Sequence, residues 1–104
     1  MAGPQFSIIP VSLLRLLAEL VRAGELQPAA LWVVASLCVY TNRDGSAYPS
    51  IATLADESGL DEKTVRRHLH ALRATRVLEV RARRKADGSQ DSNGYAFTDQ
   101  AWKL

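Results

Sequence analysis

The side chains best suited to chemistry in this sequence are nine lysines and arginines gathered between positions 63 and 85. This 23-residue window carries nine of the chain's 13 cationic residues and a single acidic one. The segments on either side, residues 1–62 and 86–104, are both net negative, so the overall charge of +2 conceals a strong local field. Concentrated positive charge of this kind is typical of proteins that bind a polyanion, and nucleic acid is the first candidate. The alternative from charge alone is a solvated helix face followed by a basic loop.

Other potentially reactive side chains have simpler structural explanations. His68 and His70 stand two positions apart, which turns them about 200° away from each other on a helix, so they cannot share a metal ion. His68 is expected to pack at the edge of the core. Asp61 and Glu62 suit the start of a helix, where negative charge is favoured.

Two residues of the most apolar segment are interpreted as packing residues. Cys38 is expected to fill space in a buried helix, and Trp32 is expected to belong to the core. The sequence contains no nucleophile with a paired base and no glycine-rich loop that would cradle a phosphate. It therefore predicts neither an enzyme nor a protein that needs a metal or another cofactor.

Length and composition predict one domain over residues 1–104, because 47% hydrophobic residues are enough for a single core. A lone cysteine excludes an intrachain disulfide. The longest apolar stretch, residues 29–40, is well short of the roughly 20 residues that cross a bilayer. No secretion signal is recognisable, so we expect a soluble cytoplasmic protein without membrane contact.

Apolar spacing predicts two helices in the first half of the chain. Residues 12–23 place Leu13 and Leu17 on one face, and Gly24 ends that helix. Residues 28–41 are apolar almost all round, which is typical of a buried central helix.

Two further helices are predicted before and within the basic window. Ser50 is a suitable N-cap for a short helix over residues 51–58, and Gly59 supplies the left-handed residue that ends it. Asp61 then caps a helix that runs to about residue 75. This helix turns its apolar residues inward and its charges outward. Its inward side holds Val65, Leu69 and Leu72, and its outward side and edges hold Lys63, Arg66, Arg67, His70, Arg73 and Ala74.

The hydrophobic period changes from helical to two at residue 77. Leu78 and Val80 alternate with polar residues, and Tyr95 and Phe97 repeat this pattern. We predict a β-hairpin whose loop, residues 84–93, protrudes because it lacks large apolar side chains. The expected fold class is mainly α with a small β-hairpin, an α+β fold.

A short helix, a glycine turn, a longer helix and a hairpin follow one another in the order of a winged helix-turn-helix. The most telling residues are Tyr48-Pro49-Ser50, Leu54-Ala55, Gly59-Leu60, Thr64-Val65-Arg66-Arg67, Leu69, Leu72, Val77-Leu78-Glu79-Val80 and Ser92-Asn93-Gly94-Tyr95. With these residues the chain resembles the winged-helix domains of plasmid and phage replication initiators and of short bacterial regulators. The resemblance covers residues 28–98, and it leaves an extra N-terminal helix within residues 1–24 and a tail at 99–104.

This resemblance implies that the helix over residues 61–75 lies in the major groove of DNA, while the loop over 84–93 reaches the backbone or a minor groove. Such domains usually have glycine where this chain has Arg76, so either the turn differs or Arg76 is kept for a phosphate contact. Thr64, near the helix start, is suited to donate a hydrogen bond to a phosphate. The candidate DNA-binding residues are Ser50, Lys63, Thr64, Arg66, Arg67, His70, Arg73, Arg76, Arg81, Arg83, Arg84 and Lys85.

We therefore expect a sequence-specific double-stranded DNA-binding protein that regulates transcription, acting on bacterial, plasmid or phage DNA without a small-molecule ligand. One alternative is a replication-initiation or partition protein of a plasmid or phage. Another is an adaptor whose winged helix binds a protein. Salt-dependent binding to random duplex separates DNA binding from the adaptor role, and the position of the bound site separates the first two.

The first helix also predicts a homodimer. Its apolar arc, from Leu16 round to Leu14, spans about 160°, which is wider than the roughly 100° that one core contact requires. A second copy of the chain would cover the excess and give a palindromic DNA site. The tail at Ala101 and Trp102 is the alternative cover for the same arc.

Overall fold

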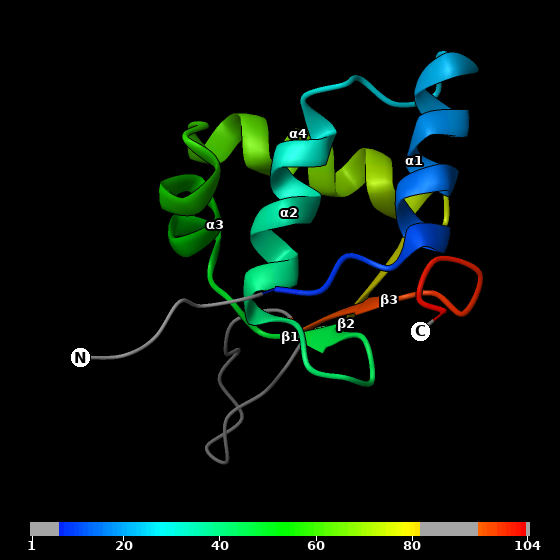
Figure 1. Ribbon diagram of the computed structural model, residues 1–104. Coiled ribbons are helices and arrows are strands. Elements are labelled where there is room, and N and C mark those ends of the chain that lie inside the picture. Colours follow the sequence, from blue (N-terminus) through cyan, green and yellow to red (C-terminus); the bar gives the residue numbers. More distant parts are fainter. Residues whose placement is uncertain (1–6, 82–93, 104) are drawn as a thin grey trace.

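Four helices and a three-stranded sheet form the part of the chain that the computed structural model describes, residues 7–81 and 94–103 (Figure 1). In chain order these elements are α1 (Val11–Arg22), α2 (Ala30–Tyr40), β1 (Ser46–Ala47), α3 (Ile51–Ser58), α4 (Glu62–Ala74), β2 (Leu78–Arg81) and β3 (Gly94–Phe97). Helices α1 and α3 flank α2, α4 lies behind it, and the sheet lies below (Figure 1). The arrangement confirms the α+β fold class.

The helix ends follow local capping chemistry. Ser50 is the N-cap of α3, where its hydroxyl oxygen accepts a hydrogen bond from the Thr53 amide at 3.1 Å. Gly59 ends the same helix in the left-handed conformation, at φ 73°. α2 begins at Ala30, two residues later than Pro28 suggests, because residues 28–29 form a turn. Among the described helices, none combines the length and the apolar character needed to cross a bilayer.

The hydrophobic core lies where α2, α3 and α4 meet the sheet. Each of these helices directs one apolar side inward, and α1 adds two leucines from its own buried side. The largest fully buried side chains are Leu13, Leu17, Val33, Val34, Leu37, Leu54, Val65, Leu72, Val77 and Leu78. The core therefore surrounds α4 on its inner side and leaves its outer side free.

The sheet is antiparallel with β3 in the middle, in the order β1-β3-β2. Val80 of β2 faces Tyr95 of β3 in the register, and Ser46 of β1 faces Ala96. The hairpin of β2 and β3 confirms the expectation from the sequence, whereas β1 is an addition to it. A strand of two residues is too short to show an alternating pattern, so only its pairing partner reveals it.

One core assignment from the sequence is wrong. Trp32 is 64% exposed, and Val39 on the same helix is 52% exposed. α2 buries the side that carries Val33 and Leu37, but its outer side is apolar as well. A helix that is apolar all round gives no indication of which side faces the core, so the sequence suggests burial for both.

The segment after β3 closes over the turn between α2 and β1. The Trp102 ring stacks on Phe97 with ring centroids 5.2 Å apart, and its Nε1 donates a hydrogen bond to the Arg43 carbonyl at 2.9 Å. Gly45 lies directly under this ring at φ +86°, and a Cβ added there would lie 3.0 Å from Trp102 Cγ. Only glycine satisfies both the backbone conformation and the close approach.

This double requirement predicts that Gly45→Ala lowers the free energy of unfolding by about 2 kcal/mol, from backbone strain and crowding of Trp102 together. Gly59→Ala is the matched control, because its backbone is equally left-handed but no atom lies within 4 Å of the added Cβ. The control is expected to lose only about 1 kcal/mol. Urea unfolding of both variants measures the difference, and equal losses would show that the Trp102 ring does not constrain this turn.

Candidate nucleic-acid interface

Helix α4 has one apolar side and one basic side. Val65, Leu69 and Leu72 are buried against the core. Their spacing of three and four residues places the remaining positions on the opposite side and its edges. All five cationic or imidazole residues expected there are exposed: Lys63, Arg66, Arg67, His70 and Arg73. The structure therefore brings these candidate residues together on one helix.

The start of α4 concentrates charge near the helix N-terminus. Asp61 occupies the N-cap position of α4. Its carboxyl group lies beside Thr64, whose hydroxyl and backbone amide lower the pKa of Asp61 below 3.8, with a smaller contribution from Arg67. Thr64 is half-buried and already interacts with Asp61. A phosphate contact from Thr64 would have to compete with this carboxylate.

The cations of α4 keep most of their positive charge available. Arg66 pairs with Glu62 one turn earlier at 3.4 Å, and both side chains are largely exposed. Such an exposed pair contributes little to stability and opens readily. Lys63, Arg67 and Arg73 make no ion pair within the described residues. Their charges are therefore free to attract an anion.

A groove runs between α4 and the sheet. Arg66, His70 and Arg73 form one wall of a hollow of about 240 Å³, and Ile51 of α3 lies at its end. The apolar lining is completed by Leu69, Val80 and Tyr95. A basic rim over an apolar floor suits a ligand with both charged and uncharged surface, such as a sugar-phosphate chain.

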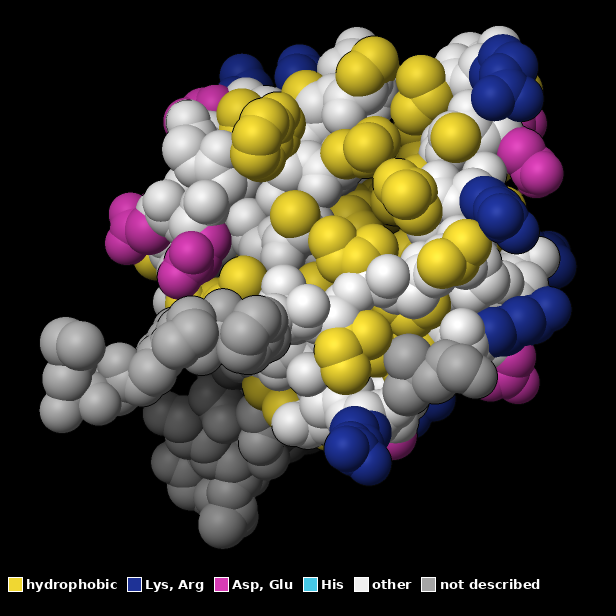
Figure 2. All heavy atoms as spheres, in the orientation of Figure 1, with side chains coloured by type: hydrophobic (Ala, Val, Ile, Leu, Met, Phe, Trp, Pro, Cys, Tyr) yellow, Lys and Arg dark blue, Asp and Glu magenta, His cyan; other side chains and the backbone are white. Residues whose placement is uncertain are grey.

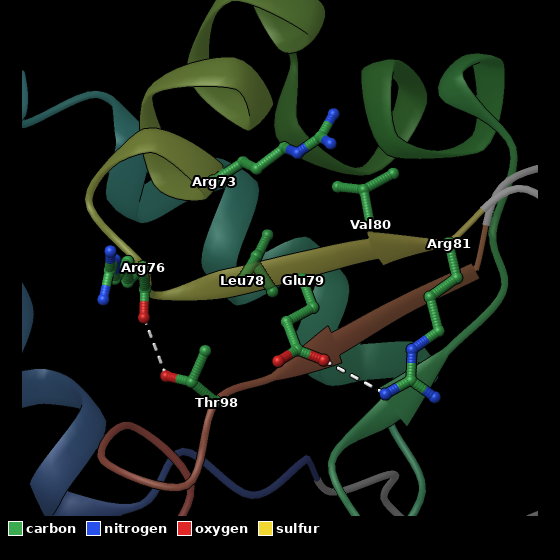
Figure 3. A pocket seen from close by; sticks show the side chains of 7 residues that line it. All are labelled: Arg73, Arg76, Leu78, Glu79, Val80, Arg81 and Thr98. Atoms are coloured by element: carbon green, nitrogen blue, oxygen red, sulfur yellow. Dashed lines mark hydrogen bonds and ion pairs between the residues drawn. The ribbon is translucent and has the colours of Figure 1, made fainter.

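The groove continues along β2 into a second hollow of about 510 Å³ (Figure 3). Arg73 and Val80 line both hollows. Figure 3 shows the Arg73 side chain extending from α4 over the strand toward Val80. The two hollows therefore form one surface, with Arg73 at its centre.

Arg81 also lines the larger hollow, at the edge of β2, but its charge is paired within the strand. Its Nη2 pairs with Glu79 Oε2 at 3.1 Å, and Figure 3 shows this pair on the side of β2 opposite Arg73. That side has its own hollow of about 360 Å³, which Asp44 and Asp99 also line. Arg81 thus stands in acidic surroundings, unlike the other basic candidates.

Arg76 adopts the backbone conformation that glycine usually provides. Its φ is 61°, and it is the one non-glycine residue with positive φ among those described. Its carbonyl oxygen accepts hydrogen bonds from Thr98 Oγ1 at 2.8 Å and from Gln100 Nε2 at 3.3 Å. The turn is therefore left-handed despite the arginine, and the Arg76 side chain is exposed and points away from Arg73 (Figure 3).

The remaining candidates fall at the edges of this surface or outside it. Ser50 is exposed at the start of α3, next to the groove residue Ile51. Arg83, Arg84 and Lys85 lie outside the described residues. The apolar floor of the groove was not predictable from the sequence. Only the pairing of Val80 with Tyr95 across two strands brings those residues beneath α4.

Two buried groups are packing residues, as expected. His68 is 3% exposed, its Nε2 has no hydrogen-bond partner among the described residues, and burial lowers its pKa below 6.5. Burial raises the pKa of the Cys38 thiol to about 11, which keeps it protonated at neutral pH. Within the described part of the chain, no three His, Cys, Asp or Glu side chains are grouped as metal ligands.

Comparison with known proteins identifies the helix pair. The sequence model of one family, described as a helix-turn-helix domain, matches residues 23–76, just over half of the chain. This match covers α2, α3 and α4 and ends before β2. A search of the curated proteins found no match. Together with the antiparallel sheet, the family match confirms the winged helix-turn-helix architecture that the sequence resembles.

The buried His68 predicts a specific pH dependence of stability. Because its pKa is lower in the folded state than in the unfolded chain, the unfolded chain binds the proton more readily. The free energy of unfolding is therefore expected to fall as the pH decreases below about 6.5. The carboxyl groups of Asp44 and Asp61, whose pKa values are also lowered, contribute a further loss only below about pH 4.

Urea unfolding of His68→Leu and His70→Gln between pH 7.5 and 5 tests this assignment. His68→Leu is expected to flatten the pH dependence over this range. His70→Gln, which replaces the exposed histidine two positions away, is expected to retain it. A slope that disappears with His70 instead would contradict the assignment.

The strained turn predicts opposite effects of one substitution at two nearby arginines. Arg76→Gly relieves a left-handed conformation and is expected to raise the free energy of unfolding by up to about 1 kcal/mol. Arg73→Gly, in the last turn of α4, is expected to lower it by about 0.5 to 1 kcal/mol. Thermal and urea unfolding of both variants provide the comparison. Destabilisation by Arg76→Gly would show that its side chain, not its backbone, determines the local stability.

Proposed function

Since the chain belongs to this family of helix-turn-helix domains, we propose that it is a sequence-specific double-stranded DNA-binding protein that regulates transcription. The helix-turn-helix domain is a DNA-binding kind of domain. In this proposal α4 is the recognition helix and lies in the major groove. No cofactor takes part, since occupation of the site by the protein is the regulatory event.

The observation that carries the proposal is the exposed basic side of α4. A helix of 13 residues is about 20 Å long and fits lengthwise into a major groove about 12 Å wide. Lys63, Arg67 and His70 stand farthest from the core and are proposed to reach base edges. Arg67 is the best candidate for a bidentate contact to guanine, because its guanidinium has no ion-pair partner among the described residues.

The groove between α4 and the sheet supports contacts to one DNA strand. Arg66 and Arg73 line its rim and are proposed to bind phosphates, while the apolar floor at Ile51 and Val80 faces the sugars. Ser50, at the start of α3 beside this groove, is proposed to donate to a neighbouring phosphate. These contacts would fix the register of α4 on the duplex without reading sequence.

The loop between β2 and β3 is proposed to be the wing. It leaves the sheet where Arg81 pairs with Gly94 in the strand register. Residues 84–93 carry the expected contacts to the backbone or a minor groove, with Arg83, Arg84 and Lys85 supplying the charge. Arg81 itself, paired with Glu79, is expected to contribute less than its neighbours along the chain.

The proposed contacts predict which substitutions change sequence preference. Duplexes selected from a random pool provide the preferred site, and its genomic position at a promoter or at iterated origin repeats tests the regulatory role. Arg67→Ala is expected to weaken binding to that site by about 1 to 3 kcal/mol and to relax the preference at one base pair. Arg43→Ala, at an exposed arginine in the turn between α2 and β1, is the control for loss of positive charge alone. An unchanged preference in Arg67→Ala would contradict the placement of α4.

Phosphate-binding residues are distinguished by the salt dependence of binding. Arg73→Ala is expected to weaken binding to selected and random duplexes equally and to reduce the salt slope by about one counterion. The Arg84→Ala, Lys85→Ala double variant is expected to reduce it by about two. Arg81→Ala, the paired arginine on the other side of β2, is the matched control and is expected to change little. A larger effect of Arg81→Ala than of Arg73→Ala would contradict this placement, because it would put the DNA on the face of β2 that carries Arg81.

A further inference from the structure

Exposed apolar side chains gather on one face of the molecule, away from the basic side of α4. Figure 2 shows them over α1, α2 and the segment that leads into α1, with charged side chains confined to the margins. Within the described residues, Trp32 is 64% exposed and Leu14 is 51% exposed. The exposed large residues of this face, which we name the apolar face, are Ile8, Ile9, Val11, Leu14, Trp32 and Val39.

Both helices of the apolar face carry a second apolar stripe besides the one in the core. On α1 the core side is formed by Leu13 and Leu17, and on α2 it includes Val33 and Leu37. The outer stripes follow helical spacings of three and four residues. They consist of Val11, Leu14 and Ala18 on α1, and of Trp32, Ala35 and Val39 on α2. Solubility does not require such stripes, and a helix that only covers a core does not need them.

The tail of the chain does not cover this face. Ser12 Oγ donates a hydrogen bond to the Ala101 carbonyl at 2.9 Å, and the Lys103 amide donates to Ser12 Oγ at 3.2 Å. The tail therefore packs on the side of α1 that carries Ser12. Leu14 lies two positions further along, about 200° round the helix, and so points to the other side. The tail, which the sequence offered as the alternative cover, therefore leaves the Leu14 side of α1 open.

From these observations we propose that the apolar face docks a second copy of this chain. The exposed fractions amount to roughly 600 Å² of apolar surface, which is at the top of the range for a monomeric protein. Two such faces together would bury about 1,200 Å², the lower limit of a specific interface. The apolar face can pack against the same face of a second copy, because both are apolar at the centre.

The charges at the margin of α1 fit the same occupant. Arg15 and Glu19 are exposed one helical turn apart and carry opposite charges, and Arg22 follows on the same side. When two α1 helices pack antiparallel about a two-fold axis, Arg15 of one copy approaches Glu19 of the other. In a parallel arrangement, by contrast, Arg15 of one copy would meet Arg15 of the other, and the like charges would repel. α4 lies behind α2 (Figure 1), so docking through this face leaves the basic side of both copies accessible.

The molar mass at different concentrations tests the interface. Sedimentation and light scattering between about 1 and 100 µM are expected to show a monomer that becomes a dimer, as befits an interface near the lower size limit. Trp32→Glu and Leu14→Glu are each expected to shift this transition at least tenfold upward in concentration. Ala74→Glu, at an exposed alanine of α4, is the matched control and is expected to leave it unchanged. Circular dichroism confirms that the variants fold.

Tryptophan fluorescence provides a second measurement without a disruptive charge. In a Trp102→Phe background the remaining tryptophan is Trp32, and its quenching by acrylamide is expected to decrease as the dimer forms. A wild-type monomer over the whole range, or a dimer that persists in both glutamate variants, would overturn the proposal. Acrylamide quenching of Trp32 that does not change with protein concentration would also overturn it. The same holds if Trp32 is protected from acrylamide only when a different protein is added. Random-duplex binding by the monomeric variants is a separate readout, so failure of the dimer does not imply failure of DNA binding.

Discussion

The burial of one side of α4 determines what its other side presents. Val65, Leu69 and Leu72 fix the rotation of the helix about its axis, because turning it by one residue, or 100°, would bring Arg66 into the core. The cations are therefore positioned by the apolar residues between them and not by contacts of their own. His68 marks the border of the buried side, where burial favours the neutral imidazole over the charged one and lowers its pKa. The basic surface of α4 and the packing of its core side thus depend on the same 13 residues.

Strand β3 holds the helix pair in place from both ends. It pairs with β1, which precedes α3, and with β2, which follows α4. The turn from α4 into β2 is secured at the Arg76 carbonyl by Thr98 and Gln100, both just beyond β3. This arrangement explains how a non-glycine residue is retained in a left-handed turn. Two hydrogen bonds from the far end of the sheet hold the backbone there, while the side chain remains available to solvent.

Features that depend on neighbours along the chain were predictable from the sequence. Ser50 and Gly59 determine where α3 begins and ends through capping chemistry. The spacing of Val65, Leu69 and Leu72 was enough to assign the two sides of α4. Two other features were not predictable, because one depends on residues distant in sequence and the other on a two-sided pattern. β1 is recognised only from its pairing with Ala96 and Tyr95, and Trp32 lies on a helix that is apolar on both sides. The groove beneath α4 was missed for the first of these reasons.

The central position of β3 also has a consequence for biosynthesis. Residues 94–97 leave the ribosome after all four helices, yet they supply the pairing partner for both other strands. Ala101 and the Trp102 ring, which complete the packing at α1 and over Gly45, follow later still. Contacts between such distant segments form slowly, because the chain loses the entropy of closing a long loop before the contact stabilises it. A nascent chain that already carries all the cations of α4 therefore still lacks the strand with which β1 and β2 pair, and the sheet beneath α4 is complete only after residue 97 has been added.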